Sequence, residues 1–324
     1  MRYITVFIAA FFPLFLFAED NLAKELQNDV KALAEEIGER NLENYENLEK
    51  SADYIAKEFK DSGLVPQMQE YKVPKGKLSS SWDNTKYWEQ TYKNVWAEIK
   101  GSEKPDEIIV IGAHYDSAAG HNCKGANDNA SGVAAVLAAA RKFSGGKYKR
   151  TIRFVAFANE EPPFFFTNYM GSYVFAKACK DKKENIVAML SMETIGYYSD
   201  EADSQSYPPG LSLFYPTTGN FIAFASNWGS RKLISKSKKY FTESVGDKLP
   251  CVSAALPVIT PMLMASDHWA FYRCGYDSVM ITDTAPYRYP YYHTSEDNYD
   301  KIDYDKMAIV VSGTLTVLTK LAGE

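Results

Sequence analysis

The chain alternates short apolar runs with longer stretches in which apolar residues recur at helical spacing. The runs lack the polar alternation of half-exposed strands, so they are typical of strands buried on both faces. We expect strands at residues 94–99, 107–113, 152–157, 186–192 and 278–283. Turn-forming residues at 101–105 separate the first two runs, which predicts that these two strands are neighbours.

Helices are predicted between and around these strands. They are expected within 21–64, at 130–143, 171–180 and 220–239, from about Asp267 to 274, and at the C-terminus, where Met307, Val311, Leu315 and Leu318 form an inward stripe. Strands separated by helices predict an α/β fold, a single globular domain with a central, mostly parallel mixed β-sheet and helices on both faces. The Pro-punctuated region 200–263 is expected to cap this sheet.

Composition narrows the class of protein. With 324 residues, 46% of them hydrophobic, the chain can bury a large core. The formal net charge is −5, with both signs mixed along the chain, so nothing indicates nucleic-acid binding. The basic run at 231–239 is interrupted by Leu233 and Ile234 and is typical of a solvated helix face. We expect a monomer.

The first eighteen residues look like a cleaved secretory signal. Arg2 precedes an apolar stretch at 4–17, and the small residue Ala18 ends it. An uncleaved anchor is the alternative, but the stretch is short for a bilayer span of ~20 residues. We therefore expect a signal peptide at 1–18 and an exported domain at 19–324, periplasmic or secreted. No later segment is long and apolar enough to suggest a membrane span.

Export would permit disulfide bonds. The four cysteines, at positions 123, 179, 251 and 274, allow three pairings, among which the sequence does not choose. No two of them form a CxxC pair, which argues against a zinc site built from thiolates.

Four ionisable side chains directly follow predicted strands or lie just beyond their ends, namely His114, Glu160, Glu161 and Glu193. An isolated histidine at such a place is more often structural, yet Asp116 stands two residues on, where it can hold the second ring nitrogen. Consecutive glutamates at the end of a buried strand are costly unless positive charge compensates them.

Asp128 and His293 extend this series. Asp128, in GANDNASG, precedes the alanine-rich helix at 130–143, where it can cap the helix or bridge two cations. His293 lies in YPYYHTSED, beyond the last predicted strand. Because the carboxyl ends of parallel strands form the ligand crevice of an open sheet, all of these side chains are expected at one site.

This set of side chains favours metal chemistry. Two imidazoles with three or four carboxylates and no thiolate suit zinc first, and manganese or cobalt second. Two ions that shared Asp128 would have three protein ligands each and would leave open positions for a bridging water. The pattern predicts a two-metal hydrolase, but spacing alone does not say which of Glu160 and Glu161 binds metal.

Five motifs, HYDS, GANDNASG, the glutamate pair, ETIGY and YHT, resemble those of the secreted dinuclear zinc aminopeptidases of metallopeptidase family M28, from residue 41 to the C-terminus. The resemblance implies a zinc-exopeptidase-like fold, two Zn2+ per chain, and peptide or protein N-termini as substrates. It implies that His114 and Glu193 bind one zinc and that Glu161 and His293 bind the other. Asp128 would bridge the two ions.

The resemblance also implies roles beyond the ligands. Glu160 would be the general base, Asp116 would orient His114, and the peptide bond after Asp128 would be cis. Secreted members often carry aspartate where this chain has Glu193, whose longer side chain still ends in a carboxylate.

An oxyanion-stabilising tyrosine is implied as well. We expect Tyr292, with Tyr289 and Tyr291 as alternatives. Aromatic residues at 164–166 and 287–292 flank the predicted ligands, which suggests a hydrophobic side-chain pocket.

Other functions on the same fold stay open, namely a carboxypeptidase, a glutaminyl cyclase or a binding relative without metal. Asp267 and His268 are expected to cap a helix or to support the ligands, because the ligand set is complete without them. His121 is expected to be solvated. The glycosylation pattern at Asn129 is interpreted as a coincidence, because the site needs this segment.

Overall fold

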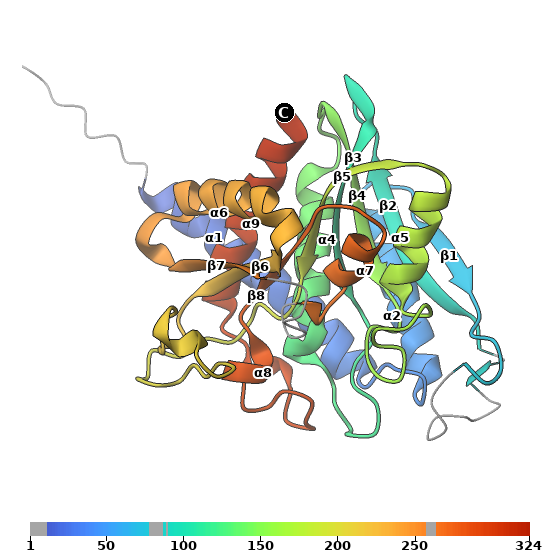
Figure 1. The fold of residues 1–324 in the computed structure, drawn as a ribbon, viewed down its shortest axis with the longest axis horizontal. Helices are drawn as coiled ribbons and strands as arrows, with labels where there is room; N and C mark the ends of the chain where they lie inside the picture. Colours follow the sequence, from blue (N-terminus) through green and yellow to red (C-terminus); the bar gives the residue numbers. More distant parts are fainter. Residues whose placement is uncertain (1–11, 78–86, 89, 257–263) are drawn as a thin grey trace, which may run out of the picture.

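The structure is a computed structural model that describes residues 12–77, 87–88, 90–256 and 264–324. Through these residues runs a mixed sheet of eight strands in the order β1-β2-β4-β3-β5-β8-β6-β7 (Figure 1). The strands are β1 (Gln67–Tyr71), β2 (Tyr92–Ile99), β3 (Lys104–His114), β4 (Arg150–Phe157), β5 (Asn185–Met192), β6 (Ile222–Asn227), β7 (Cys251–Leu256) and β8 (Ser278–Thr282).

The centre of the sheet is parallel, as predicted. Strands β4, β3, β5 and β8 run in one direction, β1 and β2 are antiparallel additions at one edge, and β6 runs antiparallel to β8. Because four neighbouring strands share one direction, their carboxyl ends lie along the same edge of the sheet. The predicted α/β fold class is confirmed.

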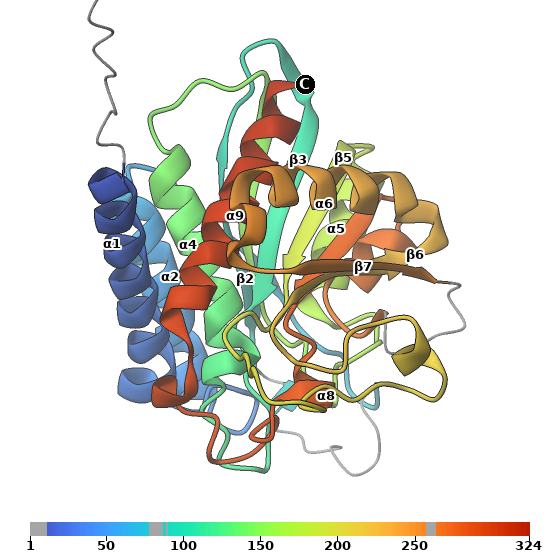
Figure 2. The same ribbon diagram turned by 90° about the vertical axis from the view of Figure 1, so that its left-hand side faces the viewer.

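Helices cover both faces (Figures 1 and 2). One face carries α4 (Ser131–Phe143) and α9 (Tyr304–Gly323), flanked by α1 (Phe12–Lys31), α2 (Tyr45–Asp61) and α6 (Arg231–Val245), and the other carries α5 (Gly171–Asp181) and α7 (His268–Arg273). Successive β3 residues serve the two cores, Ile109 the first and Ile108 the second, as the strand's alternation requires. The shorter helical elements are η1 (Ala32–Ile37), η3 (Ala126–Ala130), η4 (Leu211–Leu213), η5 (Trp228–Ser230), η6 (Gly246–Lys248), α8 (Ala285–Arg288) and η8 (Tyr299–Lys301).

Three predictions about the sheet were wrong. The region 200–263 was expected to cap the sheet, but it contributes two of its strands, β6 and β7. The runs at 94–99 and 107–113 are not neighbours, because β4 lies between β2 and β3 and pairs with both. The predicted helix at 220–239 begins with strand β6 instead, and only then does α6 follow. The apolar run that forms β6 is too short to show a periodicity that would distinguish it from the helix that follows it.

By length and composition, helix α9 could cross a membrane. No segment after the signal was predicted to be long and apolar enough for this. It is a core helix here, with 56% of its most apolar window buried. It packs against α1 and α6. A mostly buried core helix can be as long and as apolar as a membrane span, so α9 alone is weak evidence of one.

The predicted signal peptide lies largely outside the described residues, since α1 begins at Phe12, and its cleavage stays a prediction. The cysteines are all described, and all are free thiols: Cys123, Cys179, Cys251 and Cys274. None of the three possible pairings is present.

Candidate metal centre

The six predicted side chains meet at the carboxyl edge of the parallel strands. His114 is the last residue of β3, Glu160 and Glu161 lie in the loop that leaves β4, and Glu193 follows β5. Asp128 comes from η3, at the start of α4, and His293 from the loop beyond α8. The peptide bond between Asp128 and Asn129 is cis.

Two groups of three potential ligands share Asp128. In the first group, His114 Nε2 lies 3.2 Å from Asp128 Oδ1 and 3.4 Å from Glu193 Oε2. In the second, His293 Nε2 lies 3.0 Å from Asp128 Oδ2 and 3.1 Å from Glu161 Oε1. Each oxygen of Asp128 therefore faces a different histidine, and each of these histidines lies beside a different glutamate.

The donor atoms of these groups fit metal ions. Five of them are buried and make no hydrogen bond, which is rare for buried polar atoms in a folded protein. They are His114 Nε2, both carboxylate oxygens of Asp128, Glu161 Oε1 and His293 Nε2. With metal–ligand bonds of about 2.0–2.2 Å, ligands of a tetrahedral zinc lie roughly 3.3–3.6 Å apart, close to the separations found here.

The electrostatics of the cluster point the same way. Burial would lower the pKa of His114, but the carboxylates of Glu193 and Glu160 outweigh it and raise that pKa well above its usual value. Burial and the charge of Asp128 raise the pKa of Glu161 to about 7. Negative charge is thus concentrated at a buried place, and cations would relieve the repulsion.

Glu160 differs from its neighbour Glu161. It belongs to neither group, and its Oε2 atom lies 3.9 Å from His114 Nε2. Burial, together with the charges of Glu193 and Glu161, raises its pKa well above the usual value despite the opposing effect of His114. A raised pKa near the cluster suits a group that must accept and return a proton.

Asp116 acts mainly through backbone amides. Its Oδ1 accepts a hydrogen bond from the Glu160 amide and its Oδ2 one from the Glu161 amide, each at 3.0 Å. The ring of His114 also faces it, with Nδ1 3.2 Å from the Asp116 carbonyl oxygen and 3.4 Å from Oδ1. The residue thus contacts His114, as expected, and additionally positions the glutamate pair.

Sequence reasoning missed Asp297. This buried carboxylate accepts hydrogen bonds from the Asn127 amide at 2.8 Å and the Asp128 amide at 3.1 Å. The hydroxyl of Tyr289 donates to it at 2.8 Å. The signal was its place four residues after His293, but its bonds to backbone atoms leave no motif of their own.

The remaining predicted residues lie around the cluster. Asp267 is buried just before α7, but its side chain makes no capping bond. Of the two expected roles, capping by Asp267 was therefore wrong, and support of the ligands stays a prediction. Neither Asp267 nor His268 belongs to a ligand group, as expected. His121 is exposed, as predicted. Asn129 is fully buried, with its amide bound to the Met192 carbonyl oxygen at 2.8 Å, so the folded chain does not present it for glycosylation.

Comparison with known proteins identifies the family. Residues 94–318 match Peptidase family M28. The chain belongs to this family. Over 302 residues it is 35% identical to Uncharacterized protein YfbL of Escherichia coli K12, which covers 91% of this chain and 87% of that one. It is 27% identical over 320 residues to a Probable leucine aminopeptidase of Arthroderma otae, which covers 93% of this chain and 73% of that one.

The fold of the M28 chain is similar to those of solved structures of other proteins. It resembles BSAP, a zinc aminopeptidase from Bacillus subtilis, with a TM-score of 0.72 at 16% identity over 93% of this chain and 95% of that one. It also resembles the Bacteroides thetaiotaomicron glutaminyl cyclase, with a TM-score of 0.66 at 18% identity over 92% and 97%. These likenesses establish the shared fold, and membership of the family makes the chain a zinc peptidase.

The three candidate tyrosines of the M28 chain have different surroundings. The hydroxyl of Tyr289 donates a hydrogen bond to Asp297. The ring of Tyr291 packs edge-on against that of Tyr289, with centroids 5.5 Å apart. Tyr292 stacks on the ring of His293, with centroids 3.9 Å apart, and lines the same cavity as Glu160 and Glu193. Of the three, it alone lines that cavity.

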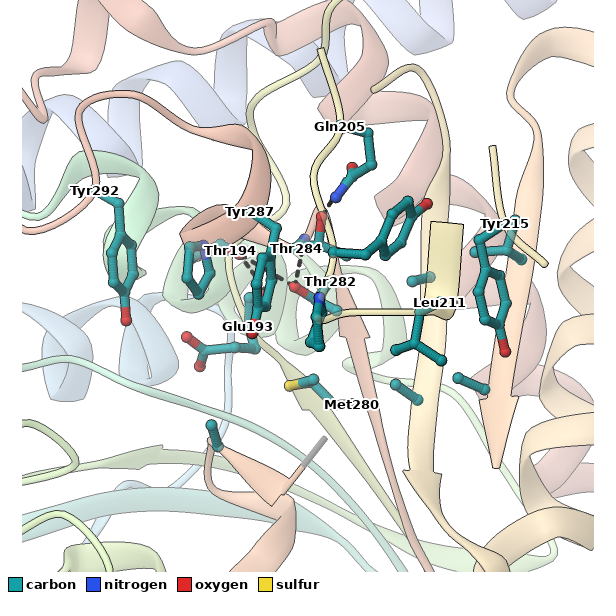
Figure 3. A pocket seen from close by; sticks show the side chains of 18 of the residues that line it. Glu193, Thr194, Gln205, Leu211, Tyr215, Met280, Thr282, Thr284, Tyr287 and Tyr292 are labelled. Atoms are coloured by element: carbon teal, nitrogen blue, oxygen red, sulfur yellow. Dashed lines mark hydrogen bonds between the residues drawn. The ribbon is translucent and has the colours of Figure 1, made fainter. Parts of the chain in front are cut away.

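A cavity of about 300 Å³ extends from the cluster over the sheet. Figure 3 shows Glu193 and Tyr292 toward one end and Leu211 and Tyr215 at the other. The sheet side of the cavity is formed by small or apolar residues of β6, β7 and β8, namely Ala223, Ala225, Val252, Ala254, Leu256 and Met280.

The polar groups along the far part of this cavity are already bonded within the protein. The hydroxyls of Tyr207 and Tyr215 donate to the carbonyl oxygens of Pro216 and Ser253. Thr284 donates to Gln205. Of the aromatic residues expected around a pocket, Phe165, Tyr287 and Tyr292 line it, whereas Phe164 is buried in the core.

Proposed function

We propose that this chain is an exported two-zinc aminopeptidase, which hydrolyses the N-terminal peptide bond of peptides or proteins. The observation that carries the proposal is the position of Asp128, whose two carboxylate oxygens belong to two separate ligand groups. His114 and Glu193 would hold one zinc, and Glu161 and His293 the other. Bound zinc ions would polarise the scissile carbonyl and make water a nucleophile at neutral pH.

The protein side chains would handle protons and orientation. Glu160, which no ligand group includes, would accept a proton from the attacking water and return it to the leaving amine. The Tyr292 hydroxyl would donate a hydrogen bond to the developing oxyanion. The apolar cavity would receive the side chain of the N-terminal residue, because the tyrosine hydroxyls among the described residues of its far part are already hydrogen-bonded within the protein and are not free to bind a charged side chain.

The test compares wild type, Glu160→Ala and Glu201→Ala, a matched change at an exposed glutamate. Zinc content and turnover of aminoacyl anilides are measured on the mature chain. We expect two zinc ions in all three proteins, full turnover in Glu201→Ala, and a loss of several orders of magnitude in Glu160→Ala. Substantial turnover in Glu160→Ala would refute the assignment of the base.

The same preparation separates the alternatives on this fold. An aminopeptidase cuts peptides with a free N-terminus and is indifferent to C-terminal amidation, whereas a carboxypeptidase shows the opposite pattern. A glutaminyl cyclase converts an N-terminal glutamine to a ring and releases ammonia without cutting the peptide. Cyclisation as the main reaction would replace the proposal.

A further inference from the structure

Arg40 is a fully buried cation close to the metal centre. It is 0% exposed, and within the described part of the chain no carboxylate oxygen lies within ion-pair distance of its guanidinium. An arginine keeps its charge in a protein, and a buried charge without a partner is costly. Its hydrogen bonds explain how the charge is accommodated.

The guanidinium binds only backbone carbonyl oxygens. Nε donates to Tyr115 O at 2.6 Å, Nη2 to Gly125 O at 2.7 Å, and Nη1 to Lys124 O. Nη1 also reaches the carbonyl oxygens of Gly38 and Leu33, at 3.3 and 3.4 Å, within the N-terminal segment itself. The five contacts use all three guanidinium nitrogens. A planar guanidinium presents its N–H donors in fixed directions, which suits carbonyl oxygens arranged around it.

These carbonyl groups belong to the segments that carry two ligand candidates. Tyr115 directly follows His114, and Gly125 lies three residues before Asp128. The Gly125 carbonyl oxygen also accepts the Ala130 amide at 3.1 Å, so it belongs to the turn that presents Asp128. Arg40 therefore joins the end of β3 to the loop before α4.

Ser117 fastens the same junction. Its hydroxyl donates to the Cys123 carbonyl oxygen at 2.9 Å and accepts from the Arg40 amide at 3.2 Å. Its own amide donates to the Arg40 carbonyl oxygen at 2.9 Å. There is no room for a side chain at residue 125, since a Cβ on Gly125 would lie 2.7 Å from Ser117 Cβ.

We propose that Arg40 is a positioning residue that sets the separation of His114 and Asp128, and thereby the affinity of the first metal position. The second position depends on His293 and Asp128, and Asp297 holds the Asp128 amide by a hydrogen bond that does not involve Arg40, although the charge of Asp297 acts on the guanidinium. The inference rests on the proposed metal pair. It assigns the first position a support at both His114 and Asp128, of which the second position shares only the part at Asp128.

The test measures zinc affinity, by competition with a chromophoric chelator, in two single-site backgrounds. Glu161→Ala leaves the first group as the complete one, and Glu193→Ala leaves the second. Adding Arg40→Lys keeps the charge but removes the fork. We expect zinc affinity to fall about 10–100-fold in the Glu161→Ala background and to change by less than about threefold in the Glu193→Ala background.

Arg141→Lys is the matched control, because Arg141 also bonds to several groups, the carboxylates of Glu25, Asp29 and Glu58, but contacts no ligand-bearing segment. It should lower the unfolding temperature of the chain and leave both affinities unchanged. If Arg40→Lys behaves like this control, or weakens both positions equally, the inference is wrong.

If Arg40→Lys does not fold, Ser117→Ala decides, since it loosens the same junction without disturbing the buried charge. It should weaken the first position selectively, and unchanged affinity at that position would overturn the inference. Wild type that binds fewer than two zinc ions would instead overturn the proposed metal pair, so the two failures are distinguishable.

Discussion

Asp116 and Asp297 hold the ligand-bearing segments in the same way, each with one carboxylate oxygen on each of two consecutive amides. Asp116 binds the amides of Glu160 and Glu161, and Asp297 those of Asn127 and Asp128. Neither aspartate belongs to a ligand group. In the candidate metal centre, these two carboxylates thus position the segments that carry the potential ligands through the backbone.

Asp297→Asn tests this layer. An amide side chain can accept only through its oxygen, so its NH2 group would face one of the two backbone donors. We expect the free energy of unfolding to fall by about 1–3 kcal/mol and zinc affinity to fall about 10–100-fold. Denaturant titration and chelator competition measure the two effects. Asp300→Asn, at an exposed position nearby, is the control, and equal behaviour of the two variants would contradict the role.

The shared position of Asp128 predicts an asymmetry in metal content. Asp128→Ala removes an oxygen from both groups, so neither ion should survive dialysis. Glu161→Ala removes a ligand from the second group only, so one ion should remain. Elemental analysis of both variants after dialysis gives the answer. If Asp128→Ala retained one ion as firmly as Glu161→Ala, Asp128 would not be a bridge.

Tyr292→Phe tests the oxyanion role. Removing one such hydrogen-bond donor lowers kcat by about 10²–10³-fold, and KM should change little because the interaction forms in the transition state. Tyr291→Phe, which alters a ring outside the cavity, should leave kcat within about threefold. Steady-state kinetics on one anilide compares them. Comparable losses in both variants would count against Tyr292.

The pKa values predict how the metal-free chain responds to pH. Burial and nearby carboxylates raise the pKa of Glu161 to about 7, and burial raises that of Asp267 to about 7. A carboxyl with a higher pKa in the folded state binds its proton more tightly there, so stability is lost as pH rises from about 4 through 7. His293, whose pKa is raised to about 11, adds a loss above about 6.5.

The unfolding temperature of the metal-free chain should therefore be lower at pH 7.5 than at pH 5. Zinc should restore more stability at pH 7.5, because its ligands are then deprotonated. Glu161→Gln should flatten the pH dependence, since it removes one of the titrating groups. A metal-free chain that became more stable between pH 5 and pH 7.5 would contradict this assignment of charge.

The cavity predicts a preference for large apolar N-terminal residues. Ala225 of β6 lines it, beside its cross-strand partner Met280 of β8. Ala225→Phe would fill part of the space, so kcat/KM for phenylalanine anilide should fall about tenfold or more while alanine anilide changes by less than about threefold. The small substrate controls for folding and for the metal centre. Equal losses on both substrates would mean that this cavity does not hold the side chain.

The strand-end chemistry was readable from the sequence. His114, Glu161 and Glu193 each sit at or just beyond the end of a buried apolar run, and parallel strands bring such ends together. Spacing along the sequence does not show which of Glu160 and Glu161 would bind metal. The two residues are adjacent, and the direction of each side chain is set only when the loop folds. The structure separates them by the distances to His114 and His293.

Hydrogen bonds from side chains to distant backbone groups could not be predicted from the sequence. Arg40 and Asp297 act on carbonyl groups and amides, which every residue has, so no motif marks their partners. The predicted order of the strands was wrong for a related reason. Local pattern shows that β2, β3 and β4 are strands, but cross-strand pairing depends on the whole sheet, and it placed β4 between the other two.

The number of zinc ions that the active enzyme binds decides whether Asp128 lies between two metal ions. Metal-free wild-type chain is titrated with zinc while bound metal and aminopeptidase turnover are followed together. We expect two equivalents per chain, one for each ligand group around Asp128, with full turnover only when both are bound. Saturation at one equivalent with full turnover would contradict it.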